Sequence, residues 1–347
     1  MTSATTPPTA GLDALRSDRR LDAYRGARAL VTGGLGFIAS TVVHSLVGVG
    51  ASVVVVDSLS PGQGGNRFNL RGIEDKVDVR IADIRDEAAM TDAISGCDFV
   101  FNMAASVSHL DSLDSPFHDL DVNARGTLLV LELVRRHAAE AHVVYAGTRS
   151  EYGLIQTNPV REDHPFLPTE ANSANKAVAA MYHTAYHIAH GLHTSTMRLT
   201  TTYGPRMLVQ HWRQGFINWF VRLAVEGGTF KLYGDGSQLR DLVYVDDTAR
   251  AMLLAAVVPG TAGQAFNIGS GEPVSLKQIA EMLVEIAGRG TIEHVPFPED
   301  AKRIEIGDYV ADVTKINQTL DWRPQVSLRE GLERSVRYFE AYREHYW

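Results

Sequence analysis

The chain has 347 residues, of which 45% are hydrophobic and 21% charged, a composition that is typical of globular proteins and argues against extensive disorder. Its 41 acidic residues outnumber its 33 lysines and arginines, and this net charge of −8 argues against nucleic acid as a partner. The single cysteine excludes an internal disulfide and an all-thiolate metal site. No apolar run reaches membrane-spanning length and the N-terminus has no secretory core, so we expect a cytoplasmic protein with no membrane partner and no metal.

Residues 1–24, rich in Thr and Pro and then in charge, are expected to form an N-terminal tail with a short helix near Leu12–Leu21. From Ala27 onward, short apolar runs with β-branched residues alternate with segments of helical spacing. Strands are expected at 27–32, 52–57, 77–83, 97–105, 141–147 and 194–205, and helices at 38–49, 86–94, 119–137 and 174–190. Apolar strands that alternate with helices predict an α/β fold, a Rossmann-type doubly wound parallel sheet with helices on both faces.

The pattern loosens after Pro205 into helices separated by short strands and loops. These later helices are expected at 246–257, 275–288 and 327–345. We therefore expect a Rossmann domain over 25–204, to which part of 240–270 returns, and a smaller C-terminal lobe over most of 205–347.

The first strand runs into a glycine-rich turn, Gly33-Gly34-Leu35-Gly36, and a helical segment follows the turn. A dinucleotide site needs small residues here, because the turn is tight and its backbone must approach the pyrophosphate. Free N–H groups at the start of the helix then bind phosphate. Asp57 ends the second strand, 57 − 36 = 21 residues past Gly36, where a carboxylate can bind the adenosine ribose and would repel a 2′-phosphate. The pattern therefore predicts NAD rather than NADP.

Further motifs make the sequence similar to the extended short-chain dehydrogenase/reductase family, which includes NAD-dependent nucleotide-sugar epimerases and dehydratases. The motifs are TGGLGFIAS from Thr32, ADIRD from Ala82, NMAA from Asn102, YGPR from Tyr203 and GDGSQLRD from Gly234. The resemblance covers nearly the whole chain. It implies that NAD is bound by residues in and near these motifs, namely Gly33, Gly36, Phe37, Ile38, Asp57, Ser58, Asp83, Ile84, Met103, Ala104, Ala105, Asn123, Lys176 and Leu199.

The same resemblance implies that the C-terminal lobe binds a nucleotide sugar. Arg240 in GDGSQLRD is expected to bind its diphosphate, because a guanidinium fork matches phosphate oxygens. The other expected substrate-binding residues are Ser108, Arg149, Thr201, Arg206 and Arg303, among which Arg149 can meet a carboxylate or a phosphate. Members of this family commonly dimerise through the helices that correspond to 119–137 and 174–190, so a homodimer is expected.

The catalytic segment departs from the family pattern at one position. Such enzymes combine a Ser or Thr after the fifth strand with Tyr-x-x-x-Lys on the next helix, where the tyrosine exchanges a proton with the sugar hydroxyl. Thr148 and Lys176 match this pattern, but Asn172 stands four residues before Lys176 in place of the tyrosine. An amide can orient a hydroxyl or bind the cofactor, but it does not exchange protons at neutral pH.

Another group must therefore act as the base, or the chain has lost redox chemistry. The first candidate is His109, just beyond the fourth strand, because the pKa of histidine suits proton transfer. The second is Glu151, although dehydratases and decarboxylases of the family carry their acidic residue one place earlier. Tyr152 is a weaker candidate.

Three functions remain open at this point. The leading hypothesis is an NAD-dependent nucleotide-sugar epimerase that acts through a transient 4-keto sugar. The nearest alternative is a nucleotide-sugar 4,6-dehydratase or decarboxylase, which begins with the same oxidation. An alternative of another class, suggested by Asn172, is a non-catalytic protein that binds NAD or a nucleotide sugar.

Overall fold

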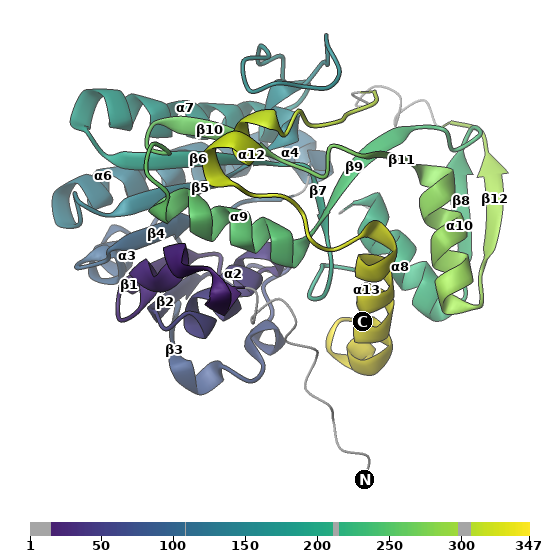
Figure 1. Ribbon diagram of the computed structural model, residues 1–347, viewed down its shortest axis with the longest axis horizontal. Coiled ribbons are helices and arrows are strands. Elements are labelled where there is room, and N and C mark those ends of the chain that lie inside the picture. Colours follow the sequence, from purple (N-terminus) through teal and green to yellow (C-terminus); the bar gives the residue numbers. More distant parts are fainter. Residues whose placement is uncertain (1–14, 108, 211–214, 298–306) are drawn as a thin grey trace.

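The computed structural model describes residues 15–107, 109–210, 215–297 and 307–347, with the backbone alone for 109 and 110. A seven-stranded sheet in the order β10-β6-β5-β4-β1-β2-β3 forms its larger domain (Figure 1). All neighbouring strands are parallel, and the order reverses between β3 and β4, which confirms the predicted doubly wound fold. The strands are β1 (Arg28–Thr32), β2 (Ser52–Asp57), β3 (Val77–Ile81), β4 (Phe99–Asn102), β5 (His142–Thr148), β6 (His193–Leu199) and β10 (Gln264–Ile268).

Helices cover both faces of this sheet, as its apolar strands require. On one face, α2 (Phe37–Gly48) and α9 (Val245–Val257) share a core with Val31 of β1. On the other face, α3 (Glu87–Ile94) and α6 (Thr127–His137) share a core with the adjacent residue Leu30. Helix α7 (Ala171–His190) packs beside α6, against β5 and β6. Neighbouring residues of one strand thus pack into the cores on opposite faces of the sheet, because side chains alternate along a strand.

Two segments predicted to lie outside this domain belong to its core. In the short helix η1 (Arg19–Tyr24), Leu21 and Tyr24 are fully buried, and the Tyr24 hydroxyl donates to Leu253 O at 2.7 Å. The tail prediction is therefore wrong for these residues, because their apolar side chains cover α9. Near the C-terminus, α12 (Thr314–Leu320) and Trp322 pack into the same core.

The long helix predicted at 119–137 is confirmed as one continuous helical run, in which α5 (Pro116–Asp119) passes through the π-helical segment η4 (Leu120–Gly126) into α6. A separate short helix, α4 (His109–Asp114), precedes this run. The buried side chain of Asn123 in η4 bonds the backbone of Ser106, so this segment is tied to the loop after β4.

The C-terminal lobe lies beside the larger domain (Figure 1) and has a hydrophobic core of its own. One small sheet has the order β11-β9-β7, and β12 pairs with β8 in another. These strands are β7 (Thr201–Tyr203), β8 (Thr229–Tyr233), β9 (Leu239–Tyr244), β11 (Pro273–Ser275) and β12 (Thr291–Val295). The helices of the lobe are α8 (Phe216–Glu226), α10 (Leu276–Ala287) and α13 (Leu328–Tyr342), and the short helix η7 (Arg343–His345) follows α13. Three other short helices belong to connections of the larger sheet: η2 (Arg67–Leu70) and η3 (Glu74–Lys76) between β2 and β3, and η5 (Arg149–Tyr152) after β5.

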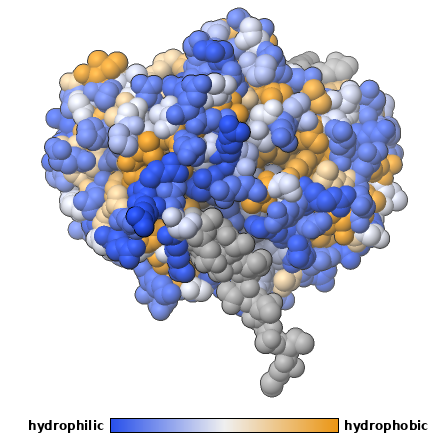
Figure 2. Space-filling view, in the orientation of Figure 1, coloured by the Kyte–Doolittle hydropathy of each residue, from blue (hydrophilic) through white to orange (hydrophobic). Residues whose placement is uncertain are grey.

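The outer surface mixes hydrophilic and hydrophobic residues on the face that Figure 2 shows. Within the described ranges, no helix combines the length and the apolar character that a membrane span requires.

Candidate functional site

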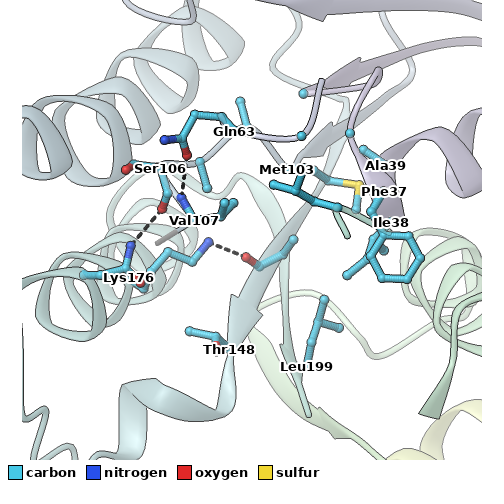
Figure 3. A pocket seen from close by; sticks show the side chains of 18 of the residues that line it. Phe37, Ile38, Ala39, Gln63, Met103, Ser106, Val107, Thr148, Lys176 and Leu199 are labelled. Atoms are coloured by element: carbon cyan, nitrogen blue, oxygen red, sulfur yellow. Dashed lines mark hydrogen bonds between the residues drawn. The ribbon is translucent and has the colours of Figure 1, made fainter. Parts of the chain in front are cut away.

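A cavity of about 700 Å³ lies at the carboxyl ends of the central strands, between the Rossmann sheet and the C-terminal lobe (Figure 3). Ligands bind at this edge in doubly wound folds, where the strand order reverses. Of the predicted cofactor residues, all but one line it: Gly33, Gly36, Phe37, Ile38, Asp57, Ser58, Asp83, Ile84, Met103, Ala104, Ala105, Lys176 and Leu199. The exception is Asn123, whose buried side chain holds the loop after β4 instead.

The glycine turn is built for close backbone approach. Gly33 has φ of +68°, and a Cβ there would lie 2.9 Å from the Cα of Ala104. At Gly34, a Cβ would lie 2.7 Å from a methyl group of Val55. Helix α2 then begins at Phe37 without a side-chain cap, so the N–H groups of its first turn face the cavity edge as a phosphate site. The turn therefore fits the pyrophosphate of a dinucleotide.

Two carboxylates mark the adenosine end of the cavity. The oxygens of Asp57 accept hydrogen bonds from Leu35 N at 3.0 Å and Leu59 N at 2.8 Å, which fixes the carboxylate at the end of β2. Burial raises the pKa of Asp57. Asp83 pairs with Arg85 at 2.7 Å, and the bond to Arg85 lowers the pKa of Asp83. Both positions suit the adenosine half of NAD.

Thr148 and Lys176 face the same cavity from β5 and α7 (Figure 3). The Nζ of Lys176 donates to Ala146 O at 2.6 Å and lies 4.4 Å from the centre of the Tyr145 ring. Burial lowers the pKa of Lys176 to about 8. The Thr148 hydroxyl accepts a hydrogen bond from Ser150 N at 3.3 Å. A hydroxyl and a desolvated amine thus border one space.

Asn172 lines the cavity, but its amide is engaged within the protein. Its Nδ2 donates to Ser106 O and to the Asp119 carboxylate, each at 2.8 Å. Asp119 also accepts a bond from Asn175 at 2.8 Å. This buried network joins the loop after β4 to α7, so Asn172 acts as a structural link between two walls of the cavity.

Glu151 does not border the cavity as the described residues define it. Its side chain is fully buried, with Oε2 3.1 Å from Arg198 Nε and Oε1 accepting a bond from Thr148 N at 2.8 Å. The structure therefore places Glu151 in a buried ion pair with Arg198 rather than on the cavity wall, and its catalytic role stays a prediction. Tyr152 is engaged as well, with its hydroxyl donating to Asn267 at 2.6 Å.

The predicted substrate residues divide into three groups. Arg149, Thr201 and Arg240 line the cavity. Arg206 does not, because its backbone has φ of 72° and its guanidinium turns to α2, where it donates to the Thr41 hydroxyl at 2.9 Å. Ser108, Arg303 and the side chain of His109 lie outside the described residues, and the His109 backbone begins α4.

Sequence reasoning missed Glu170, which lines the cavity at the start of α7. Its Oε2 accepts bonds from Asn172 N at 2.6 Å and from the Ser112 hydroxyl at 2.9 Å, and Oε1 accepts one from Ser173 N at 2.8 Å. An acidic residue before a helical run is an N-cap signal, but the helix was expected to begin at Ala174, three residues too late.

The described residues contain no group of three or more His, Cys, Asp or Glu side chains that could hold a metal ion. The cavity is lined by the glycine turn together with the hydroxyl of Thr148 and the amine of Lys176.

Comparisons with known proteins agree with this site. A family model, the NAD dependent epimerase/dehydratase family, matches residues 29–269. The chain is 33% identical to a UDP-glucose 4-epimerase from Mycolicibacterium smegmatis, over 90% of this chain and 98% of that protein. It is 34% identical to a dTDP-glucose 4,6-dehydratase from Streptomyces griseus, over 90% and 94% of the two chains. A crystal structure of dTDP-glucose 4,6-dehydratase from Streptomyces venezuelae with NAD bound has a TM-score of 0.82 at 31% identity, over 91% and 98%. The cofactor is thus NAD, and the chain belongs to the NAD-dependent epimerase/dehydratase family.

Proposed function

We propose that this protein is an NAD-dependent nucleotide-sugar epimerase that acts through a transient 4-keto sugar. The observation that carries the proposal is the position of Thr148 and Lys176, which border one cavity together with the glycine turn and Arg240. That arrangement suits a sugar held between a dinucleotide on the sheet and a diphosphate-binding arginine on the lobe.

NAD would lie along the carboxyl ends of β1, β2 and β4, with its pyrophosphate on the turn from Gly33 to Gly36 and its adenosine ribose at Asp57. When bound, NAD⁺ supplies the acceptor for the hydride that leaves the sugar carbon. Lys176 would hold the cofactor end that lies against β5, because its Nζ reaches the carbonyl of Ala146 there.

The Thr148 hydroxyl would hydrogen-bond the reacting sugar hydroxyl, since it stands at the very end of β5. Asn172 cannot take the proton, and its amide is engaged with Ser106 and Asp119. We propose His109 as the group that does. Its backbone lies one helical turn before Ser112, whose hydroxyl contacts Glu170 on the cavity wall.

Epimerisation is favoured over dehydration by the residues that follow Thr148. Elimination of water needs an acid next to the leaving hydroxyl, but Arg149 and Ser150 occupy the turn and Glu151 is buried against Arg198. Arginine does not release a proton near neutral pH. Among the described residues, three carboxylates line the cavity. Asp57 and Asp83 lie at the adenosine end, and Glu170 caps α7.

The test combines the absorbance of reduced nicotinamide with product analysis. Purified NAD-loaded protein is mixed with UDP-, GDP-, CDP- and dTDP-sugars, and the sugars are separated after hydrolysis. An epimerase gives the 4-epimer with a transient absorbance. A 4-keto-6-deoxy product would establish the dehydratase instead, and release of CO₂ would establish the decarboxylase. Unchanged sugars from the whole panel, with NAD bound, would favour the non-catalytic protein.

We also propose that the protein is a homodimer through α5, η4 and α7. Large apolar side chains are exposed there, namely Phe117 at 80%, Leu120 at 44%, Met181 at 49% and Ile188 at 78%. Such a patch marks an interaction site. Light scattering after size-exclusion chromatography would give twice the chain mass of 38.0 kDa, and a Phe117→Glu, Ile188→Glu variant would give that mass once. A cytoplasmic location stays a prediction.

A further inference from the structure

The turn that follows Thr148 carries a cation to the reactive end of the cavity. Arg149 is the first residue of η5, is half-buried, and lines the cavity. It is adjacent in the chain to Thr148, whose hydroxyl we propose to hydrogen-bond the reacting sugar hydroxyl. Its charge is therefore positioned for a group on the same sugar ring, close to that carbon.

The turn that bears Arg149 is held rigidly. Thr148 and Glu151 form a reciprocal capping box around it, in which each side chain bonds the backbone of the other end. Glu151 is also paired with Arg198 at 3.1 Å, and neither side chain is more than 8% exposed. The next residue, Tyr152, is fully buried and bonded to Asn267. Sites on such fixed elements can read a ligand by geometry.

An aromatic platform orients the guanidinium itself. The Cζ of Arg149 lies 5.4 Å from the centre of the Tyr309 ring. Tyr309 is fully buried and stacks on Tyr152, with ring centres 6.4 Å apart and planes 24° apart. A guanidinium on an aromatic face directs its N–H groups outward in its own plane, the geometry that matches a carboxylate with two parallel hydrogen bonds.

A second arginine serves the phosphates, so the two cations have separate tasks. Arg240 enters the cavity from β9 of the other lobe, where its guanidinium also donates to Leu239 O at 2.9 Å. Arg149 enters from η5, directly after Thr148 at the end of β5. The arrangement favours a negative group on the sugar in addition to the diphosphate.

We propose that the sugar carries a carboxylate close to the reacting carbon, as in a nucleoside-diphosphate uronate, and that Arg149 binds this carboxylate. The inference rests on the proposed function, since it concerns the same cavity and the same reaction. It adds the substrate class: an acidic nucleotide sugar rather than a neutral one.

The experiment compares acidic and neutral sugars on the same nucleotide. Calorimetry with UDP, dTDP, CDP and GDP first selects the nucleotide that the NAD-loaded protein binds most tightly. Epimerisation of its glucuronate and galacturonate is then measured against its glucose and galactose. We expect kcat/KM to be 10- to 100-fold higher for the uronates, the order of magnitude of a charged hydrogen-bonded pair. Equal rates, or a preference for the neutral sugars, would overturn the proposal.

Arg149→Gln tests the residue. We expect its loss of kcat/KM on the uronates to exceed its loss on the neutral sugars by about 10-fold or more. The matched control is Arg161→Gln, which removes the same charge from an arginine whose side chain is 68% exposed. Equal losses on both sugars would assign Arg149 a structural role, and a matching loss of affinity for the bare nucleotide would assign it to the diphosphate. Either result overturns the proposal.

Arg149→Lys gives the same comparison if the glutamine variant does not fold, because it keeps the charge and loses the planar fork. A different result would refute the proposed function. No epimer from either class of sugar, with NAD bound, would remove the epimerase itself, whereas epimerisation of neutral sugars alone would remove only the carboxylate.

Discussion

The buried pair of Glu151 and Arg198 predicts a large loss of stability when its negative charge is removed. In Glu151→Gln, the amide oxygen can still accept the bond from Thr148 N, but the amide N–H groups then oppose the guanidinium of Arg198. Both side chains are at most 8% exposed, so water does not screen the unpaired cation. Breaking a buried pair on one side costs about 3–5 kcal/mol. At about 2 °C per kcal/mol for a chain of this size, Tm falls by about 6–10 °C.

Thermal unfolding followed by circular dichroism measures this loss, with NAD-dependent turnover measured on the same samples. The matched control is Glu226→Gln, which breaks a more exposed pair with Arg222 at 3.0 Å and costs less than about 1 kcal/mol. Glu151→Met combined with Arg198→Met removes both charges and recovers much of the stability. If Glu151→Gln kept its Tm and lost turnover by orders of magnitude, Glu151 would be the catalytic acid and the structural reading would be refuted.

Three further changes follow from the site. Burial lowers the pKa of Lys176 to about 8, so above pH 8 the folded state binds fewer protons than the unfolded state. The free energy of unfolding, relative to that of Lys176→Met, should therefore rise from about pH 8 to 10.5. Denaturant titrations should show a rise of at most about 1.4 kcal/mol per pH unit. A flat difference would mean that the amine titrates normally. Gly33→Ala should weaken NAD binding, measured by calorimetry, at least about 10-fold, because the new Cβ would lie 2.9 Å from Ala104. In the control Gly288→Ala, φ is +63° and nothing lies within 4 Å of the new Cβ, so the free energy of unfolding should fall by only about 1 kcal/mol. His109→Ala should abolish turnover and leave NAD bound in equilibrium dialysis, and turnover at the normal rate would eliminate its role as base.

The fold and the cofactor end of the site were predictable because their signals are local. A strand, a glycine turn and a helix follow one another within Arg28–Gly48, and Asp57 closes the next strand at the spacing that ribose binding requires. Close contacts at Gly33 and Gly34 restrict these positions to glycine, so the dinucleotide-binding turn can be identified from the residue types alone.

The catalytic end was harder to predict, because partners distant in sequence decide where its side chains point. Glu151 carries the residue type of an acid catalyst, but Arg198, 47 residues later, draws it into the core. Arg206 lies in a family motif, yet its positive φ turns it to Thr41, 165 residues earlier. Asn123 likewise contacts Ser106 rather than the cofactor. The position of a residue in a motif predicts which part of the fold it lies in, and its tertiary contacts decide whether the side chain points into the cavity.

The late return of the chain to the sheet has a consequence for synthesis on the ribosome. Strands β1 to β6 are complete by Leu199, but the face that carries Val31 and Val55 waits for α9, and the sheet edge at β6 waits for β10, which ends at Ile268. Tyr24 finds its acceptor on Leu253, and Trp322 arrives later still. A nascent chain therefore exposes an apolar sheet face and an open edge until residues 200–268 have been translated, the interval in which such a protein depends most on chaperones.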